Sequence, residues 1–264
     1  MDQHTVLPLL PAGLGRVQVV PRTGSTSTDL VAAAADEADW PDRSVLVADH
    51  QAAGRGRAGR SWVTEPGTAV TFSVLLRPRV PVDRFGWIPL LGGLAVVRAL
   101  GRRGVAAALK WPNDVLVAPP GADEVDGWGR WRKVAGVLGD LVPGSSAAVV
   151  GIGVNVTGPA PVPHAASLAD LGVDADRAVL LAAVVRELVD LDDRWRAARG
   201  DAVAADLADE VVEVCLTVGA DVRVQRPDGE IEGRAIGLSD DGALLILGAD
   251  GTEHTVLAGD VLLR

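Results

Sequence analysis

The sequence predicts an α+β protein in which a mixed β-sheet flanked by helices is followed by a small C-terminal β-barrel. In the first part of the chain, short β-branched apolar runs occur together with long segments of helical apolar period. From Thr217 onward, short alternating strands are separated by Pro-Asp-Gly, Asp-Asp-Gly and Ala-Asp-Gly turns. The 264 residues therefore divide into a larger domain, residues 1–216, and a smaller one, residues 217–264.

The strands of the larger domain are predicted where Val, Leu and Ala dominate short runs. These runs are residues 17–20, 44–48, 69–76, 133–142 and 147–156. Residues 106–117 also have strand character, but Pro112 interrupts them, and a proline inside a strand pattern marks an edge or a bulge. Residues 118–131, rich in Pro, Gly and Asp, are expected to form an exposed excursion between strands.

Helices are predicted from capping residues and from apolar positions spaced by three or four. Ser25 or Thr26 can cap a helix that continues through the alanine run to residue 35. Further helices are predicted at residues 83–103, 176–199 and 201–214. The core-facing positions are Trp87, Leu90, Leu91, Leu94 and Val97 in the first of these, and Leu180, Val184, Leu188, Leu191 and Trp195 in the second.

The composition excludes several classes of protein. A hydrophobic content of 48% excludes a disordered chain, and no apolar run is long and uncharged enough to cross a bilayer. Residues 1–20 lack the features of a signal peptide, so a cytoplasmic location is expected. The single cysteine, Cys215, excludes an internal disulfide, and the scattered histidines argue against a histidine metal site. A net charge of −10 argues against general binding to DNA or anionic membranes.

The segment Gln51–Trp62 concentrates positive charge on a flexible backbone. Three arginines, Arg55, Arg57 and Arg60, alternate with three glycines between two predicted strands. Such a loop is expected to be mobile when empty and to bind an anion, although a solvated basic turn is the alternative. Gly54–Ser61 nearly matches a P-loop, but arginine stands where lysine is needed and a strand follows instead of a helix.

Lysine is almost absent from this chain. Of 25 basic residues only Lys110 and Lys133 are lysine, which makes both candidates for chemistry that needs a compact, flexible ammonium, with an ordinary ion pair as the alternative. Lys110 lies beside Asn113 and Asp114 at the irregularity around Pro112, and Asp114 can hold Mg²⁺ or orient an amine.

A glycine pattern marks the last strand of the larger domain. Gly151 and Gly153 alternate on one face of residues 147–156 and remove side chains there. A flat ligand can therefore lie against the backbone, where Asn155 can contact one of its edges.

Four stretches, taken in this order, resemble biotin–protein ligases. They are Gly-Ser-Thr-Ser at 24–27, Gly-Arg-Gly-Arg-Ala-Gly-Arg-Ser-Trp at 54–62, Lys-Trp-Pro-Asn-Asp at 110–114, and Lys-Val-Ala-Gly at 133–136 leading into Gly-Ile-Gly-Val-Asn at 151–155. The resemblance implies a catalytic domain like that of class II aminoacyl-tRNA synthetases and an SH3-like C-terminal barrel. It also implies formation of biotinyl-5′-AMP from biotin and ATP with Mg²⁺, and transfer of biotin to a lysine of a biotin carboxyl carrier domain.

The resemblance also implies roles for individual residues. Positions that bind biotin or its activated carboxyl match Ser25, Thr26, Ser27, Gln51, Arg55, Gly56, Arg57 and Lys133. Positions around ATP and the adenylate match Arg55, Arg60, Trp62, Lys110, Asn113, Gly136, Gly151 and Asn155. The catalytic candidates are Arg57, Lys110, Lys133 and Asp114, the last also as the Mg²⁺ ligand.

The sequence departs from the family pattern in three places. Ser27 stands where members often have Asn, the excursion at residues 118–131 is longer than the usual turn, and a helix-turn-helix domain is not expected. The partner is therefore expected to be a carrier domain and not DNA or a membrane, with the enzyme a monomer or weak homodimer. Two alternatives stay open, a lipoate–protein ligase with the same adenylation chemistry and a non-enzymatic nucleic-acid-binding protein. The acidic C-terminal domain and the lack of interleaved aromatic residues disfavour the latter.

Overall fold

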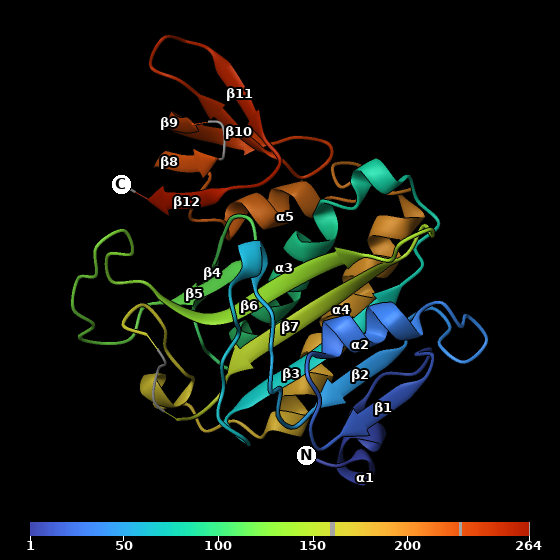
Figure 1. Ribbon diagram of the computed structural model, residues 1–264. Helices are drawn as coiled ribbons and strands as arrows, with labels where there is room; N and C mark the ends of the chain where they lie inside the picture. The colour runs from blue at the N-terminus through green and yellow to red at the C-terminus, as the bar shows by residue number, and fades with distance from the viewer. Residues whose placement is uncertain (159–161, 227–228, 264) are drawn as a thin grey trace.

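Two β-sheets organise the chain (Figure 1). The computed structural model describes residues 1–158, 162–226 and 229–263. The larger sheet has seven strands in the order β1-β2-β3-β7-β6-β5-β4. Its β1 and β2 pair in parallel and its other neighbours pair antiparallel, so the predicted mixed sheet is confirmed. The strands are β1 (Val17–Val20), β2 (Val45–Ala48), β3 (Ala69–Leu76), β4 (Ala107–Lys110), β5 (Asp114–Val117), β6 (Arg132–Leu141) and β7 (Ala148–Asn155).

Helices cover both faces of this sheet. The helices are α1 (Gln3–Val6), α2 (Thr26–Ala33), α3 (Trp87–Gly101), α4 (Arg177–Ala197) and α5 (Leu207–Glu213), with 3₁₀ turns at Leu7–Leu9, Arg57–Gly59, Val82–Arg84 and Ala169–Leu171. In Figure 1, α3 and α4 lie behind the sheet, whereas α2 crosses in front of β3 and β7. The front face is therefore left largely open beside α2, and this is where the loop after β2 folds back.

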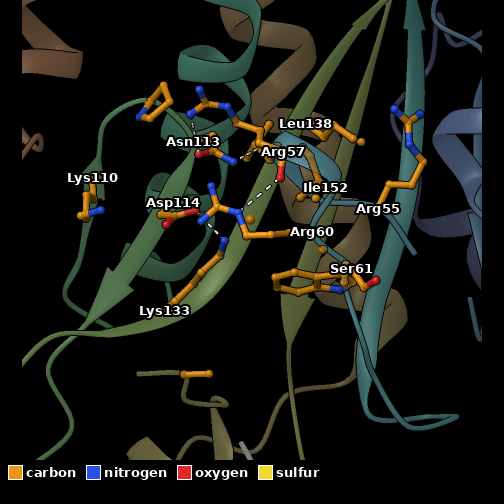
Figure 2. A pocket seen from close by; sticks show the side chains of 18 of the residues that line it. Arg55, Arg57, Arg60, Ser61, Lys110, Asn113, Asp114, Lys133, Leu138 and Ile152 are labelled. Carbon is orange, nitrogen blue, oxygen red and sulfur yellow. Dashed lines mark hydrogen bonds and ion pairs between the residues drawn. The ribbon is translucent and has the colours of Figure 1, made fainter. Parts of the chain in front are cut away.

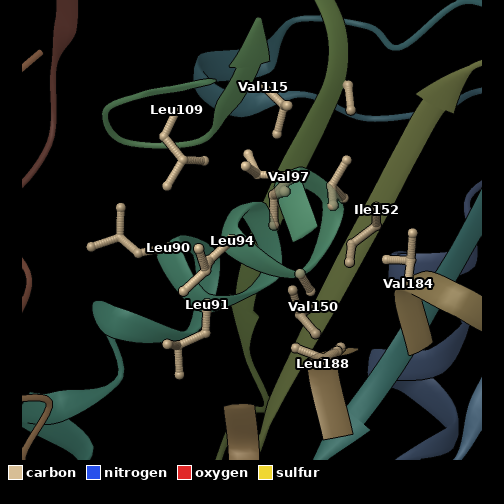
Figure 3. Packing of buried hydrophobic residues seen from close by; sticks show 14 of the residues in the cluster. Leu90, Leu91, Leu94, Val97, Leu109, Val115, Val150, Ile152, Val184 and Leu188 are labelled. Carbon is tan, nitrogen blue, oxygen red and sulfur yellow. The ribbon is translucent and has the colours of Figure 1, made fainter. Parts of the chain in front are cut away.

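The main core lies between the sheet and the pair α3 and α4. Figure 3 shows this cluster of buried side chains. Leu94 and Val97 come from α3, Val150 and Ile152 from β7, and Val184 and Leu188 from α4. Every core-facing residue predicted for these two helices is buried. Burying a large aliphatic side chain stabilises the fold by about 1.5–3 kcal/mol. The apolar back face thus provides the rigid support on which the open front face is built.

Two predicted helices are shorter than the sequence suggested. Residues 83–86 are not part of α3, because Val82–Arg84 form a separate 3₁₀ turn and Gly86 is the N-cap of the helix. The helix predicted at 201–214 begins only at Leu207. Asp201 caps a turn by accepting hydrogen bonds from Val203 and Ala204, and Asp206 has a positive φ of 56°. Local turn chemistry overrides helical periodicity in both places.

The segment predicted as one interrupted strand at residues 106–117 is a hairpin of β4 and β5. Pro112 lies in the turn between them, after a cis Trp111–Pro112 bond. β4 is the last strand of the sheet, which agrees with the edge position expected for a proline. The turn places Lys110, Asn113 and Asp114 together at one end of the sheet.

The smaller sheet lies at the C-terminus and has the order β11-β10-β9-β8-β12. Its antiparallel strands are β8 (Asp221–Arg226), β9 (Gly229–Leu238), β10 (Leu244–Leu247), β11 (Glu253–Val256) and β12 (Asp260–Leu263). This confirms a small C-terminal β domain. Trp111 donates its indole N–H to the carbonyl of Gly242 at 3.1 Å, so the small domain packs on the β4–β5 turn. A boundary at residue 216 stays a prediction.

Candidate functional site

A cavity of about 810 Å³ lies on the open face of the larger sheet. Its walls are the start of α2, the loop Gln51–Trp62, the β4–β5 turn, the strands β6 and β7, residues 162–165 and part of β12. Every residue that the sequence predicted for the site lines it: Ser25, Thr26, Ser27, Gln51, Arg55, Gly56, Arg57, Arg60, Trp62, Lys110, Asn113, Asp114, Lys133, Gly136, Gly151 and Asn155. Motifs that are far apart in sequence thus converge on one cavity.

One end of the cavity is lined by the uncharged side chains of Ser25, Thr26, Ser27 and Gln51, with the buried hydroxyl of Ser73 behind them, and we call these five residues the neutral end. Ser25 caps α2, as predicted, and exposes the first turn of that helix to the cavity. The Gln51 side-chain oxygen accepts from the Thr26 backbone N–H at 2.8 Å and from its hydroxyl at 3.0 Å. Ser73 lies 2.8 Å from the Thr26 hydroxyl and 3.0 Å from that of Ser27. These groups are held in place by one another before any ligand arrives.

Two glycines of β7 make room for two side chains of the protein itself. A Cβ on Gly151 would lie 2.2 Å from the Ser27 hydroxyl, and one on Gly153 would lie 2.5 Å from the Trp62 ring. The Trp62 indole covers the surface beside Gly153, and the binding of a flat ligand against this strand stays a prediction. The indole nitrogen of Trp62 is buried and has no hydrogen-bond partner in the described part of the chain.

The loop Gln51–Trp62 is folded into a small hairpin. Arg55 and Ser61 form an antiparallel bridge, and the Trp62 N–H donates to the carbonyl of Gly54 at 2.9 Å. At the tip, Ala58 and Gly59 have positive φ angles of 51° and 74°. Its glycine content serves these turns, and its mobility when empty stays a prediction.

The arginines of this loop have different environments. Arg57 turns inward, and its guanidinium lies 3.4 Å from the side-chain oxygen of Asn113. Burial lowers the pKa of Arg57, although the charges of Asp260 and Asp114 act in the opposite direction. Arg55 is 47% exposed and pairs with Asp140 at 3.2 Å, away from the other cations (Figure 2). Arg60 pairs with Asp260 of β12.

Lys133 and Asp114 form an ion pair at the start of β6 and β5. The ammonium lies 2.5 Å from the carboxylate and 5.5 Å from the centre of the Trp62 ring. Figure 2 shows these two side chains pointing toward each other. We call Arg57, Lys110, Lys133, Asn113 and Asp114 the cationic end of the cavity.

Lys110 is the most enclosed of these cations, with 8% of its surface exposed. Burial lowers its pKa and the neighbouring charge of Lys133 adds to this effect, while Asp114 opposes it. Its ammonium lies 4.9 Å from the centre of the Trp128 ring. The two lysines of the chain thus share one site, where they present concentrated positive charge to any anion that enters.

The donor set limits how a metal ion can be held here. In residues 1–158, 162–226 and 229–263, no group of three or more His, Cys, Asp or Glu side chains converges as a metal site would require. Asp114 alone, paired with Lys133, fits a Mg²⁺ ion only if a bound molecule supplies most of its oxygen ligands.

Sequence reasoning missed four residues that line or support the cavity. Ser73 lies within a strand of continuous apolar character, so nothing marked its hydroxyl as functional. Trp128 and His164 stack with ring centres 4.5 Å apart, although neither lies in a motif. Asp260 pairs with Arg60, which is 200 residues earlier in the sequence. The one available signal was the presence of a tryptophan between two glycines in the excursion.

Two family models match this chain. Residues 19–157 match the Biotin/lipoate A/B protein ligase family, and residues 217–264 match the Biotin protein ligase C terminal domain. No helix in the described residues is long and apolar enough to cross a membrane.

Individual proteins are similar over most of the chain. A biotin--[acetyl-CoA-carboxylase] ligase of Mycobacterium tuberculosis is 39% identical across 96% of this chain and 92% of its own length. The bifunctional ligase/repressor BirA of Escherichia coli is 27% identical across 95% of this chain and 74% of its own. Among solved structures, a biotin protein ligase from Aquifex aeolicus in complex with biotin and ATP has a TM-score of 0.74 and 29% identity, covering 95% of this chain and 99% of that one.

Proposed function

The chain belongs to the biotin/lipoate A/B protein ligase family as a biotin protein ligase, and from this premise we propose that it forms biotinyl-5′-AMP from biotin and ATP and then transfers biotin to a lysine of a biotin carboxyl carrier domain. The observation that carries the proposal is the pairing, in one cavity, of a neutral end with a cationic end. The first suits an uncharged polar ring, and the second suits a carboxylate and a phosphate.

Biotin would bind with its ureido ring at the neutral end. A urea group has both donors and acceptors, and the hydroxyls of Thr26 and Ser27, each backed by the Ser73 hydroxyl, can serve as either. Its carboxylate would then reach the cationic end. Uncharged hydroxyl groups favour a ureido ring over the dithiolane of lipoate, because sulfur accepts hydrogen bonds only weakly.

Adenylation would occur at the cationic end. A carboxylate oxygen of biotin attacks the α-phosphorus of ATP, the bond to the β-phosphate oxygen breaks, and pyrophosphate leaves. Negative charge builds up on the phosphate oxygens in the transition state, so cations that are already in place stabilise it most. Lys133, fixed by Asp114 at 2.5 Å, and Arg57, buried beside Asn113, are the groups best held for this purpose.

ATP would enter with Mg²⁺, which neutralises phosphate charge when bound. Asp114 is the protein carboxylate that would hold the ion, together with phosphate oxygens. Trp62 and Asn155 would lie beside the adenosine part. The Asn155 amide N–H donates to the Ala166 carbonyl at 3.1 Å, which fixes the orientation of that side chain.

In the transfer step, the amine of the carrier lysine attacks the carbonyl carbon of biotinyl-5′-AMP, and AMP leaves. The hairpin formed by Gln51–Trp62 would cover the adenylate and keep water away from it. The partner in this step would be a carrier domain of a biotin-dependent carboxylase.

Mass spectrometry of the acyl-adenylate tests the proposal directly. The purified chain is incubated with Mg²⁺–ATP and either biotin or lipoate, followed by addition of a carrier domain. We expect biotinyl-5′-AMP and a carrier heavier by one biotin, with little product from lipoate. A lipoyl-adenylate as the main product would replace the biotin ligase with a lipoate ligase, and no adenylate from either acid would overturn both.

A further inference from the structure

The excursion between β5 and β6, residues 118–131, contains an ordered hairpin. Val125 and Gly129 bridge, and their backbone groups exchange hydrogen bonds of 2.9 and 2.8 Å. The Arg132 guanidinium is buried beneath them and donates to the carbonyls of Gly129 at 3.0 Å, of Trp131 at 2.9 Å and of Asp123. Because the Arg132 guanidinium satisfies three backbone carbonyls, it stabilises the shape of this hairpin.

Trp128 is the residue of this hairpin whose side chain lines the cavity. Its ring stacks on the His164 imidazole with an interplanar angle of 16°, so the plane of the indole is fixed from the side of residues 162–165. The residue before it, Gly127, lies close to Leu262 of β12, so the hairpin tip reaches the small domain at the cavity.

Lys110 depends on this ring for its position. Its side chain is a flexible four-carbon stem, and in the described residues it belongs to no ion pair within 4.0 Å, unlike Lys133. The contact that does orient its ammonium is the face of Trp128 at 4.9 Å. A cation over an indole face is attracted by the ring quadrupole, and the attraction is greater where water is excluded.

We propose that Trp128 is a positioning residue that holds the Lys110 ammonium toward the phosphates of bound ATP. The inference rests on the proposed function in taking ATP as the ligand of the cationic end. It gives the long excursion a role, because the hairpin supplies to Lys110 the support that Asp114 supplies to Lys133. Burial and the charge of Lys133 lower the pKa of His164, which favours its uncharged form beside Trp128.

A double-mutant cycle tests this inference. The dissociation constant of Mg²⁺–ATP is measured by calorimetry for wild type, Trp128→Leu, Lys110→Met and the double variant, with no biotin present. We expect Trp128→Leu to weaken ATP binding by roughly 2- to 30-fold, the range of a cation–π contact. In the Lys110→Met background the same change should have an effect of less than about twofold, because the ring then has no ammonium to hold.

Two further variants separate positioning from folding. Trp128→Phe retains an aromatic face and should bind ATP within about threefold of wild type. Trp131→Leu removes an indole from the same hairpin but outside the cavity, and it should leave ATP affinity unchanged. The inference is overturned if Trp128→Leu weakens binding equally in both backgrounds, if Trp131→Leu has the same effect, or if Lys110→Met leaves ATP binding unaltered. Because biotin is absent, these results do not depend on which acid the enzyme adenylates.

Discussion

The neutral end and the cationic end of the cavity hold their polar groups in different ways. At the neutral end, Thr26, Ser27, Ser73 and Gln51 satisfy one another through short hydrogen bonds on α2 and β3. At the cationic end, charges are buried beside one another, and burial lowers the pKa of both Arg57 and Lys110. A buried cation without a full set of partners is costly until an anion arrives. The first end is therefore suited to recognition and the second to stabilising charge that develops during reaction.

Replacement of Arg57 is expected to have the largest effect on this contrast. Arg57→Ala removes a cation that should contact the activated carboxyl or phosphate, at a cost of about 2–4 kcal/mol. Adenylate formation should slow by roughly 30- to 900-fold, and the adenylate that forms should escape from the enzyme. Trapping of free biotinyl-5′-AMP measures the escape, while circular dichroism checks the fold. Unchanged retention would remove Arg57 from the cationic end.

The substitution Lys133→Arg tests whether charge alone is enough there. Arginine brings a wide planar fork in place of a compact ammonium that lies 2.5 Å from Asp114, and a misplacement of about 1 Å can cost on the order of a hundredfold in rate. The rate of pyrophosphate release measures this loss, with thermal melting to confirm folding. Arg130→Lys, a change of cation outside the cavity, is the matched control. Activity of Lys133→Arg within threefold of wild type would make Lys133 an ordinary ion-pair partner.

A smaller effect of a different kind is expected at the neutral end. Ser27→Ala removes a hydroxyl that lies 3.0 Å from Ser73, and one hydrogen bond is worth about 0.5–1.5 kcal/mol. Biotin affinity, measured by calorimetry, should therefore fall by roughly 2- to 12-fold. Ser145→Ala, whose hydroxyl donates to Val142 in the β6–β7 turn, should bind biotin like wild type. If Ser27→Ala binds biotin as tightly as wild type does, the neutral end does not recognise the ligand through this residue.

The smallest effect is expected where the small domain meets the loop. Arg60 and Asp260 pair with 59% and 55% of their side chains exposed, and such pairs contribute less than about 1 kcal/mol. Asp260→Asn should therefore change the adenylation rate by less than about fivefold, and less still at high salt. A loss beyond tenfold would show that the small domain takes part in the chemistry at the cationic end.

Removal of residues 217–264 tests the contribution of the whole small domain. The truncation takes away the hydrogen-bond partners of Trp87 and Trp111, which donate to Asp240 and Gly242, so we expect loss of stability together with loss of transfer. Thermal melting of the truncated chain separates these effects. A truncated enzyme that stays folded and biotinylates its carrier at full rate would show that the domain has no catalytic part.

Much of the fold followed from the sequence, and the failures have local causes. The strands at 69–76 and 147–156 were predictable because they are predominantly apolar and rich in β-branched residues, as expected for buried strands. The start of α3 was not, because residues 82–84 form a separate 3₁₀ turn that helical periodicity does not distinguish from the helix itself. The β4–β5 hairpin was not predicted, because two short strands joined by three turn residues resemble one irregular strand in the sequence.

The cavity was predictable to the extent that its residues lie in motifs. All sequence-predicted site residues line it, yet the sequence did not reveal that Gly153 makes room for Trp62 or that Ser73 joins the neutral end. Trp128 and His164 were missed because a side chain in an excursion without periodicity carries no sequence signal of where it points.

The central claim is that the neutral end recognises biotin and the cationic end stabilises the transition state. It is tested most directly by the single-turnover rate of biotinyl-5′-AMP formation when biotin and ATP are both saturating. Under these conditions a defect in recognition is overcome, whereas a defect in transition-state stabilisation persists. We predict that Ser27→Ala regains the wild-type rate and that Lys133→Arg stays about a hundredfold slower. A Ser27→Ala enzyme that remains slow at saturation, or a Lys133→Arg enzyme that recovers, would contradict the account.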